Sequence, residues 1–265
     1  MKIKSLAGLK KADKYEIMLA ELPQEICMTR YSRDKAYKIN ELVRHLFQRS
    51  YEWYGFTLAH NQRPELIVDI GLPKNDQNLE NYVGLAADKI AEFRDSLPEA
   101  TVINGWIHSH GDLDYRRFSE TDTINQRTVL DYVTSLLRLP VAKVEVVIKD
   151  LVLLHGTAWS AEDLKNGSVS LVTDNPVSEA RIWETEYGGF CYAIVVGDDG
   201  WHEQEIHCKK RGILSGRTCY SKIPASIRLS DDGRLLTFTE VEALEEEVRN
   251  QLAPVAYVPD KLEGL

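Results

Sequence analysis

The segment GWIHSH at residues 105–110 constrains the fold of this chain more than any other part of the sequence. Thr101–His108 is rich in β-branched and aromatic residues, which predicts a strand that is buried over at least part of its length. Alternate side chains of an extended strand point to the same face, so His108 and His110 are expected side by side at its end. Two neighbouring imidazoles in this position can bind one metal ion with little rearrangement.

A second polar element follows the two histidines. Ser119 and Asp122 have the spacing of a capping box and predict the start of a helix that runs to about Leu139, before Pro140. From the first turn, the carboxylate of Asp122 can reach the ion that the histidines bind. Two imidazoles and one carboxylate leave a fourth tetrahedral position open to water, as in catalytic zinc sites. Folding alone also explains these residues, since Ser119 can cap a helix and the helix dipole favours Asp122.

Hydrophobic periodicity alternates along the chain between the helical and the extended pattern. Further helices are expected at Ala36–Ser50, Leu79–Leu97 and Glu240–Leu252. Strands are expected at Trp53–Ala59, Glu65–Ile70 and Val144–Leu154, and β-hairpins at Phe190–Val196 with Trp201–Cys208 and at Ala225–Ser230 with Arg234–Thr239. The segment 164–186 shows no clear period. This order predicts an α/β fold, with a mixed β-sheet flanked by helices and additional C-terminal β-hairpins.

Composition narrows the classes of function. The 265 residues carry a net charge of −9, which argues against a protein that binds nucleic acid through a basic face. No segment has the roughly 20 consecutive apolar residues of a membrane span, and the lysine-rich N-terminus lacks the apolar core of a signal peptide. We therefore expect a cytoplasmic protein. No phosphate-binding glycine motif is present, and the four cysteines have no paired spacing and are expected to be free thiols: Cys27, Cys191, Cys208 and Cys219.

The histidines and the capping box together resemble the signature of the JAMM (MPN-plus) metallopeptidases. The H-x-H pair of the family is matched by His108 and His110, and its S-x-x-D element by Ser119 and Asp122. The family also needs a glutamate in an E-x-x-G context after its first helix, and Glu52 occupies that position. The order of the expected elements agrees with the family from about residue 35 to residue 150.

The resemblance implies an MPN fold, of the cytidine-deaminase-like kind, and a division of the chain. An N-terminal extension would cover residues 1–34 and a catalytic domain residues 35–212. A C-terminal extension, with a β-hairpin and a short helix, would cover residues 213–265. The family includes deubiquitinases and prokaryotic relatives that act on ubiquitin-like proteins, and this chain resembles the prokaryotic members.

The resemblance also implies roles for the motif residues. His108, His110 and Asp122 would bind one catalytic Zn²⁺. Glu52 would take a proton from the zinc-bound water and deliver it to the leaving amine, and Ser119 would donate a hydrogen bond to the oxyanion. The implied substrate is a ubiquitin-like protein or its conjugate, cut at an amide or isopeptide bond of the C-terminal tail. An activating protein partner or a homodimer is compatible with this interpretation.

Two features depart from the family motif. Gly111 follows the second histidine, where the family usually has proline. Eight residues rather than seven separate His110 from Ser119, so the loop 111–118 is one residue longer than usual. A loop tolerates such an insertion. Because this loop is long and charged, we advance the hypothesis that it gates the site until a partner orders it.

Two other classes of function remain open at this point. Many MPN domains are scaffold subunits that bind no metal, although these have generally lost one of the motif residues that are present here. The second class is that of other H-x-H metallohydrolases, which need further histidines. A zinc deaminase would need a P-C-x-x-C element, which is absent.

Overall fold

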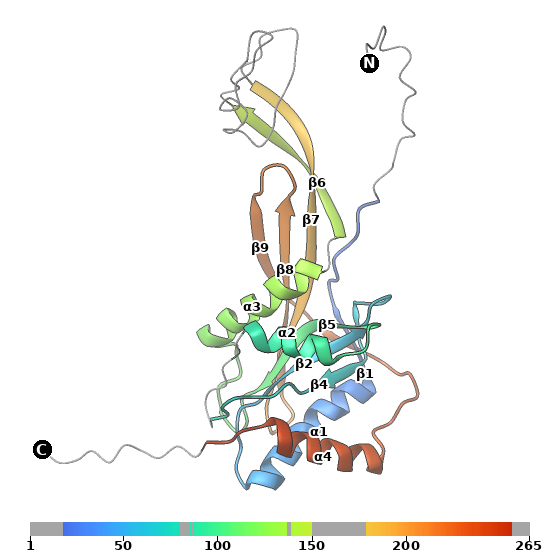
Figure 1. Ribbon diagram of the computed structural model, residues 1–265, viewed down its shortest axis with the longest axis vertical. Helices are drawn as coiled ribbons and strands as arrows, with labels where there is room; N and C mark the ends of the chain where they lie inside the picture. Colours follow the sequence, from blue (N-terminus) through green and yellow to red (C-terminus); the bar gives the residue numbers. More distant parts are fainter. Residues whose placement is uncertain (1–17, 80–84, 86, 137–138, 150–178, 256–265) are drawn as a thin grey trace, which may run out of the picture.

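A computed structural model of the chain describes residues 18–79, 85, 87–136, 139–149 and 179–255 (Figure 1). The elements along the chain are β1 Ile26–Thr29, α1 Arg30–Phe47, β2 Tyr54–His60, β3 Leu66–Ile67, β4 Asp69–Gly71, α2 Ala87–Ser96, β5 Thr101–Ser109, α3 Glu120–Leu136, β6 Leu139–Lys149, β7 Glu179–Val196, β8 His202–Gly212, β9 Thr218–Pro224, β10 Ile227–Ser230 and α4 Phe238–Gln251. Most strands belong to one mixed sheet with the order β4-β2-β5-β7-β8-β9, in which β6 also pairs with β7. The expected mixed α/β architecture with flanking helices is confirmed.

Strand β5 lies inside this sheet, between β2 and β7. It runs antiparallel to β2, with Tyr54 opposite His108, and parallel to β7, with Val195 opposite His108. The strand is buried from Ile103 to Ser109. The strand expected at Thr101–His108 is therefore confirmed, and hydrogen-bonded neighbours on both sides hold the end that carries the histidines.

The two faces of the sheet bury different hydrophobic clusters. On one face, α1 and α4 pack against a cluster that includes Ile107 and Ile194. On the other face, α2 and α3 cover a cluster that includes Phe56 and Trp106, and the two pairs of helices lie on opposite sides of the sheet in Figure 1. Because side chains alternate along β5, His108 lies on the same face as Trp106. This is the face on which α3 begins.

A second, three-stranded sheet joins distant parts of the chain. β1 runs parallel to β3 on one side and to β10 on the other, with Ile26 opposite Ile227. The expected strand Glu65–Ile70 is thus divided, because β3 pairs with β1 whereas β4 pairs with β2 in the large sheet. Side chains of Ile227 and Leu229 pack against the cluster on the α1 face.

The second predicted hairpin, at Ala225–Ser230 with Arg234–Thr239, is wrong. β10 takes β1 as its partner, and the residues after Gly233 lead directly into α4. Thr237 caps α4 in a reciprocal capping box with Glu240, so this stretch begins a helix rather than continuing a strand. Pairing with β1 places the partly buried apolar side chains of β10 against the core, a contact that an isolated two-stranded hairpin would lack.

Other boundaries differ in smaller ways. The first helix begins at Arg30 rather than at residue 36, and the helix expected to reach Leu139 ends at Leu136. β6 then starts at Leu139 and includes Pro140, which lies at an irregularity in the pairing with β7 where a missing N–H is tolerated. Of the helix expected at Leu79–Leu97, the structure describes α2 only, and residues 80–84 and 86 lie outside the described residues.

The β7–β8 hairpin is confirmed, with Val196 opposite His202 and Gly200 in the turn at φ 86°. β9 adds a further antiparallel strand to β8. β6 and the first part of β7 form a long ribbon that extends away from the helices in Figure 1. Residues 150–154 of the expected strand, and most of the unassigned segment 164–186, lie outside the described residues.

The predicted boundary at residue 34 falls within α1, and β1 precedes it. Beyond the boundary at residue 212, β10 pairs with β1 and α4 contributes Leu244 and Val248 to the cluster on the α1 face. Both terminal segments therefore share a hydrophobic core with the middle of the chain. Among the described helices, none combines the length and the apolar character needed to cross a bilayer. All four cysteines are free thiols, as expected.

Candidate metal centre

Three side chains from two elements meet at the end of β5. His108 and Ser109 end the strand, His110 follows it, and Asp122 lies on the first turn of α3. The Nε2 atoms of the two histidines are 3.3 Å apart. Asp122 Oδ1 lies 3.2 Å from His108 Nε2, and Asp122 Oδ2 lies 3.3 Å from His110 Nε2. The three ligand atoms lie within 4.8 Å of one another, which is close enough to hold one metal ion.

The two histidines are oriented by different contacts. His110 Nδ1 donates to the carbonyl oxygen of Tyr115 at 2.8 Å, which leaves Nε2 free to act as a ligand. The ring of His108 stacks on Trp106, with centroids 4.1 Å apart and planes 16° apart. His108 Nδ1 is buried and has no hydrogen-bond partner among the described residues. Packing therefore orients His108, whereas a hydrogen bond orients His110.

The predicted capping box is confirmed and also positions the carboxylate. The backbone N–H of Asp122 donates to Ser119 Oγ at 3.1 Å, and the backbone N–H of Ser119 donates to Asp122 Oδ2 at 2.7 Å. The carboxylate of Asp122 is therefore anchored at the helix start while both of its oxygens face the histidines. The same side chain can therefore serve both as a helix cap and as a metal ligand, so neither role excludes the other.

The protonation preferences of His108 and Asp122 suit a divalent cation. Burial lowers the pKa of His108, against the effect of Asp122, so this imidazole is neutral at pH 7 and can act as a ligand. Burial alone would raise the pKa of Asp122, but hydrogen bonds from both histidines outweigh it and hold that pKa well below its usual range. For His110 burial works in the opposite direction from its contacts with Asp122 and Tyr115, which prevail and raise the pKa. His110 holds its proton more tightly than a free imidazole does in the metal-free protein, so a metal ion must displace that proton.

Glu52 is buried beside this group, in the segment that leads into β2. Burial raises the pKa of Glu52 to about 7; the charge of His110 opposes the rise and the charge of Asp122 adds to it. Ser109 N–H donates to the Trp53 carbonyl at 2.9 Å, which joins the glutamate segment to the strand between the two histidines. The structure thus brings together the five residues that the sequence singled out: Glu52, His108, His110, Ser119 and Asp122.

Aromatic residues that no sequence motif marks as site residues border the group. The ring of Trp201, in the β7–β8 turn, lies 6.0 Å from His110, and that of Phe118 lies 6.0 Å from His108. Arg116 bonds Asp199 at 2.6 Å and lies 5.8 Å from the Trp201 ring. These contacts connect the loop 111–118 to the turn. They depend on tertiary packing, and no spacing along the chain predicts them.

Gly111 explains one departure from the motif. This residue adopts φ 55°, a value that the proline ring excludes and that glycine adopts without strain. Its carbonyl accepts the N–H of Asp198 at 2.9 Å, so the loop turns toward the β7–β8 hairpin directly after His110. Glycine at this position is therefore consistent with the longer loop.

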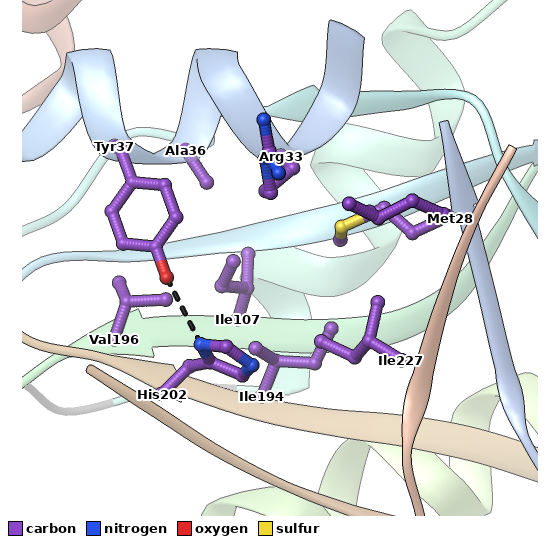
Figure 2. A pocket seen from close by; sticks show the side chains of 10 residues that line it. Met28, Arg33, Ala36, Tyr37, Ile107, Ile194, Val196, His202 and Ile227 are labelled. Atoms are coloured by element: carbon purple, nitrogen blue, oxygen red, sulfur yellow. Dashed lines mark hydrogen bonds between the residues drawn. The ribbon is translucent and has the colours of Figure 1, made fainter. Parts of the chain in front are cut away.

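A separate cavity of about 160 Å³ lies on the opposite face of the sheet, between α1 and the strands (Figure 2). Most of its lining is apolar, including Ile107 and Ile194. At one end Tyr37 contacts His202 Nδ1 at 3.1 Å and donates to the carbonyl of Gly200 at 3.0 Å. Since Ile107 points away from the face that carries His108, this cavity is not part of the metal centre.

The chain was compared with families and proteins of known function. No family model matches it, and no curated protein matches it at a significant level.

Proposed function

We propose that this chain is a zinc-dependent hydrolase of the JAMM class with an MPN fold, which cuts amide or isopeptide bonds at the C-terminal tail of ubiquitin-like proteins. The observation that carries the proposal is the convergence of His108, His110 and Asp122 with Glu52 buried beside them. Each of these residues stands at its place in the motif that the sequence resembles. Scaffold domains that only look like such enzymes have no need to keep all of them.

Zinc fits this donor set and is the metal that the motif resemblance implies. Two imidazole nitrogens and one carboxylate oxygen are the ligands of catalytic zinc sites, whereas magnesium and calcium prefer oxygen ligands alone. His108, His110 and Asp122 would hold the ion. Zinc supplies Lewis-acid polarisation of a carbonyl group and acidification of water.

Glu52 has the properties of a general acid–base group. A carboxylic acid with a pKa of about 7 exists in both protonation states at neutral pH, so it can accept a proton and return it. In the proposed reaction Glu52 takes a proton from the attacking water and passes it to the leaving amine. Its burial, which raises the pKa, is therefore part of the chemistry.

Ser119 is proposed to stabilise the oxyanion. Its Oγ accepts a hydrogen bond from the N–H of Asp122, and the hydroxyl hydrogen remains available for donation to another group. A donor held on a helix start, with little freedom to move, costs no reorganisation when charge develops on the substrate. The same contact makes Ser119 a helix cap, so its two roles must be separated by experiment.

The substrate class rests on the resemblance to the JAMM family. The tails of ubiquitin-like proteins are extended and end in small residues, which lets them bind a sheet edge and a narrow site. The net charge of −9 suits a partner with a basic patch.

For the proposed gate, the relevant contact is the Arg116–Asp199 ion pair, which connects the loop 111–118 to the β7–β8 turn.

The proposal is tested with zinc-loaded protein and a ubiquitin-like domain fused through its C-terminal tail to a reporter. Wild type should cleave the fusion after the tail, and Glu52→Gln should bind the same amount of zinc and cleave at least ~100-fold more slowly. Equal cleavage by both proteins would remove Glu52 from the mechanism. Zinc binding without cleavage of any ubiquitin-like fusion or conjugate would favour the scaffold alternative, and full activity without a partner would refute the gate.

A further inference from the structure

We infer that Asn78 is a positioning residue for Glu52, and that residues 251–255, which comprise the last residue of α4 and the chain after it, complete the site by holding Asn78 in place. Asn78 is fully buried, and its Nδ2 donates to the carbonyl oxygen of Glu52 at 2.8 Å. The backbone N–H of Glu52 donates to the carbonyl of Leu79 at 2.9 Å. Both polar backbone groups of Glu52 are therefore bound by one short segment.

The opposite edge of the Glu52 segment is bound to the histidine strand. Ser109 N–H donates to the Trp53 carbonyl at 2.9 Å, and the N–H of Trp53 donates to Ser109 Oγ at 3.3 Å. The backbone of Glu52 consequently lies between Ser109 on one side and Asn78 on the other. Since Ser109 belongs to the strand that carries both histidines, Asn78 provides the second of two supports that set the distance of Glu52 from the metal centre.

The chain after α4 supports Asn78 in turn. Ala253 N–H donates to Asn78 Oδ1 at 2.8 Å, and the N–H of Asn78 donates to the Ala253 carbonyl at 3.0 Å. Val255 N–H donates to the Asn78 carbonyl at 2.9 Å. The side-chain and backbone groups of Asn78 are thus all used, and three of these bonds come from residues about 175 positions away in sequence.

A second asparagine locks the same segment. Asn75, also fully buried, accepts the N–H of Tyr54 at 3.1 Å and donates to the Tyr54 carbonyl at 3.2 Å. Its Oδ1 also accepts from Asn78 Nδ2 at 2.9 Å, and its backbone N–H donates to the Gln251 carbonyl at 2.7 Å. Buried amides with every group paired are rigid, and their loss leaves unpaired polar groups. Through this network, residues 251–255, far from the motif residues in sequence, support the backbone of Glu52 and Tyr54.

The test compares Asn78→Ala with Asn104→Ala in the full-length protein. Asn104 is equally buried and makes two side-chain hydrogen bonds, against three for Asn78, but it does not contact Glu52. Its partners are Thr57 Oγ1 at 2.7 Å and the Pro64 carbonyl at 2.8 Å. Both variants should lose thermal stability. Only Asn78→Ala should raise amide hydrogen exchange at least ~tenfold in peptides that cover residues 50–54 and 251–255.

Kinetics supply the second readout, and this part of the inference rests on the proposed function. Asn78→Ala should keep its zinc and its KM for the fusion and lose ~10- to 100-fold in kcat, because the general base is displaced while the metal ligands are not. Asn104→Ala should keep kcat within about twofold. If Asn78→Ala does not fold, Ala253→Pro removes one donor to Asn78 and should give a smaller loss of the same kind.

The outcomes separate the two claims. Unchanged exchange at residues 50–54 in Asn78→Ala would overturn the positioning role, and so would loosened exchange together with an unchanged kcat. An equal fall of kcat in Asn104→Ala would also overturn it, because the effect would then be general destabilisation. A wild type that cleaves no fusion would refute the proposed function, while the exchange comparison would still decide whether Asn78 and residues 251–255 hold Glu52.

Discussion

The backbone N–H of Ser109 donates to the carbonyl oxygen of Trp53 at 2.9 Å. Ser109 lies between the two histidines, and Trp53 directly follows Glu52. One backbone hydrogen bond therefore ties the candidate metal ligands to the candidate general base. Because adjacent strands lie about 4.8 Å apart, this pairing places the groups within reach of one substrate.

The raised pKa of Glu52 predicts how the stability of the metal-free protein depends on pH. Its pKa is about 7 in the folded protein and near 4.5 in the unfolded chain, so between these values the folded state binds more protons. Stability from this group is thus present below about pH 4.5 and is lost as pH rises to about 7. Glu52→Gln should therefore stabilise the metal-free protein at pH 8 by about 2–3 kcal/mol and change it little at pH 4.5. Denaturant unfolding after chelation measures this, and a pH-independent difference would contradict it.

Ser119 is predicted to have two roles, as the cap of α3 and as a hydrogen-bond donor to the oxyanion. Thr237, the cap of α4, serves as a control that separates them. Ser119→Ala and Thr237→Ala each remove an N-cap side chain, the first on α3 and the second on α4. Each should cost about 1 kcal/mol in the free energy of unfolding. Only Ser119→Ala should also reduce the rate of fusion cleavage, by about 100-fold, because we propose that its hydroxyl donates to the oxyanion. Equal cleavage by the two variants would leave Ser119 with the cap alone.

Gly111 is predicted to be intolerant of a side chain. An added Cβ would lie 3.1 Å from the Cβ of Ser50, and φ 55° is strained for any L-residue. Gly233 has φ 76°, but a Cβ added to Gly233 would have no heavy atom within 4 Å. Gly233→Ala should therefore cost about 1 kcal/mol and Gly111→Ala about 2 kcal/mol or more. Thermal unfolding of both variants measures the difference, and equal losses would show that the Ser50 contact is relieved without cost.

Local patterns in the sequence predicted the parts of the site that lie on single elements. The apolar run of β5 fixed the position of His108, and the spacing of Ser119 and Asp122 identified the start of α3, because both features depend on neighbours within a few residues. Glu52 was found through the resemblance and its place after the first helix. Each of these signals is short-range along the chain.

Pairings between distant segments were not predictable in this way. The sequence of β10 is also compatible with one strand of a hairpin, and its true partner, β1, is evident only in the structure. Asn78 and Ala253 meet across 175 positions, and an isolated asparagine carries no sign of its partner. Trp201 looked like an ordinary strand residue until the turn placed it against His110. Side-chain partners chosen by tertiary packing leave no periodic trace in a single sequence.

The proposed metal centre is tested by the zinc content of the purified protein after exposure to Zn²⁺ and removal of the excess. The measurement compares wild type with His110→Ala and His60→Ala. His60 is exposed and lies at the far end of β2, so it serves as the matched control. We expect one tightly held ion in wild type and in His60→Ala, and more than ~100-fold weaker binding in His110→Ala, since loss of a group that only hydrogen-bonds a metal ligand already costs about 10- to 100-fold. Wild type that holds no zinc, or His110→Ala that holds it as tightly, would contradict the proposed metal centre.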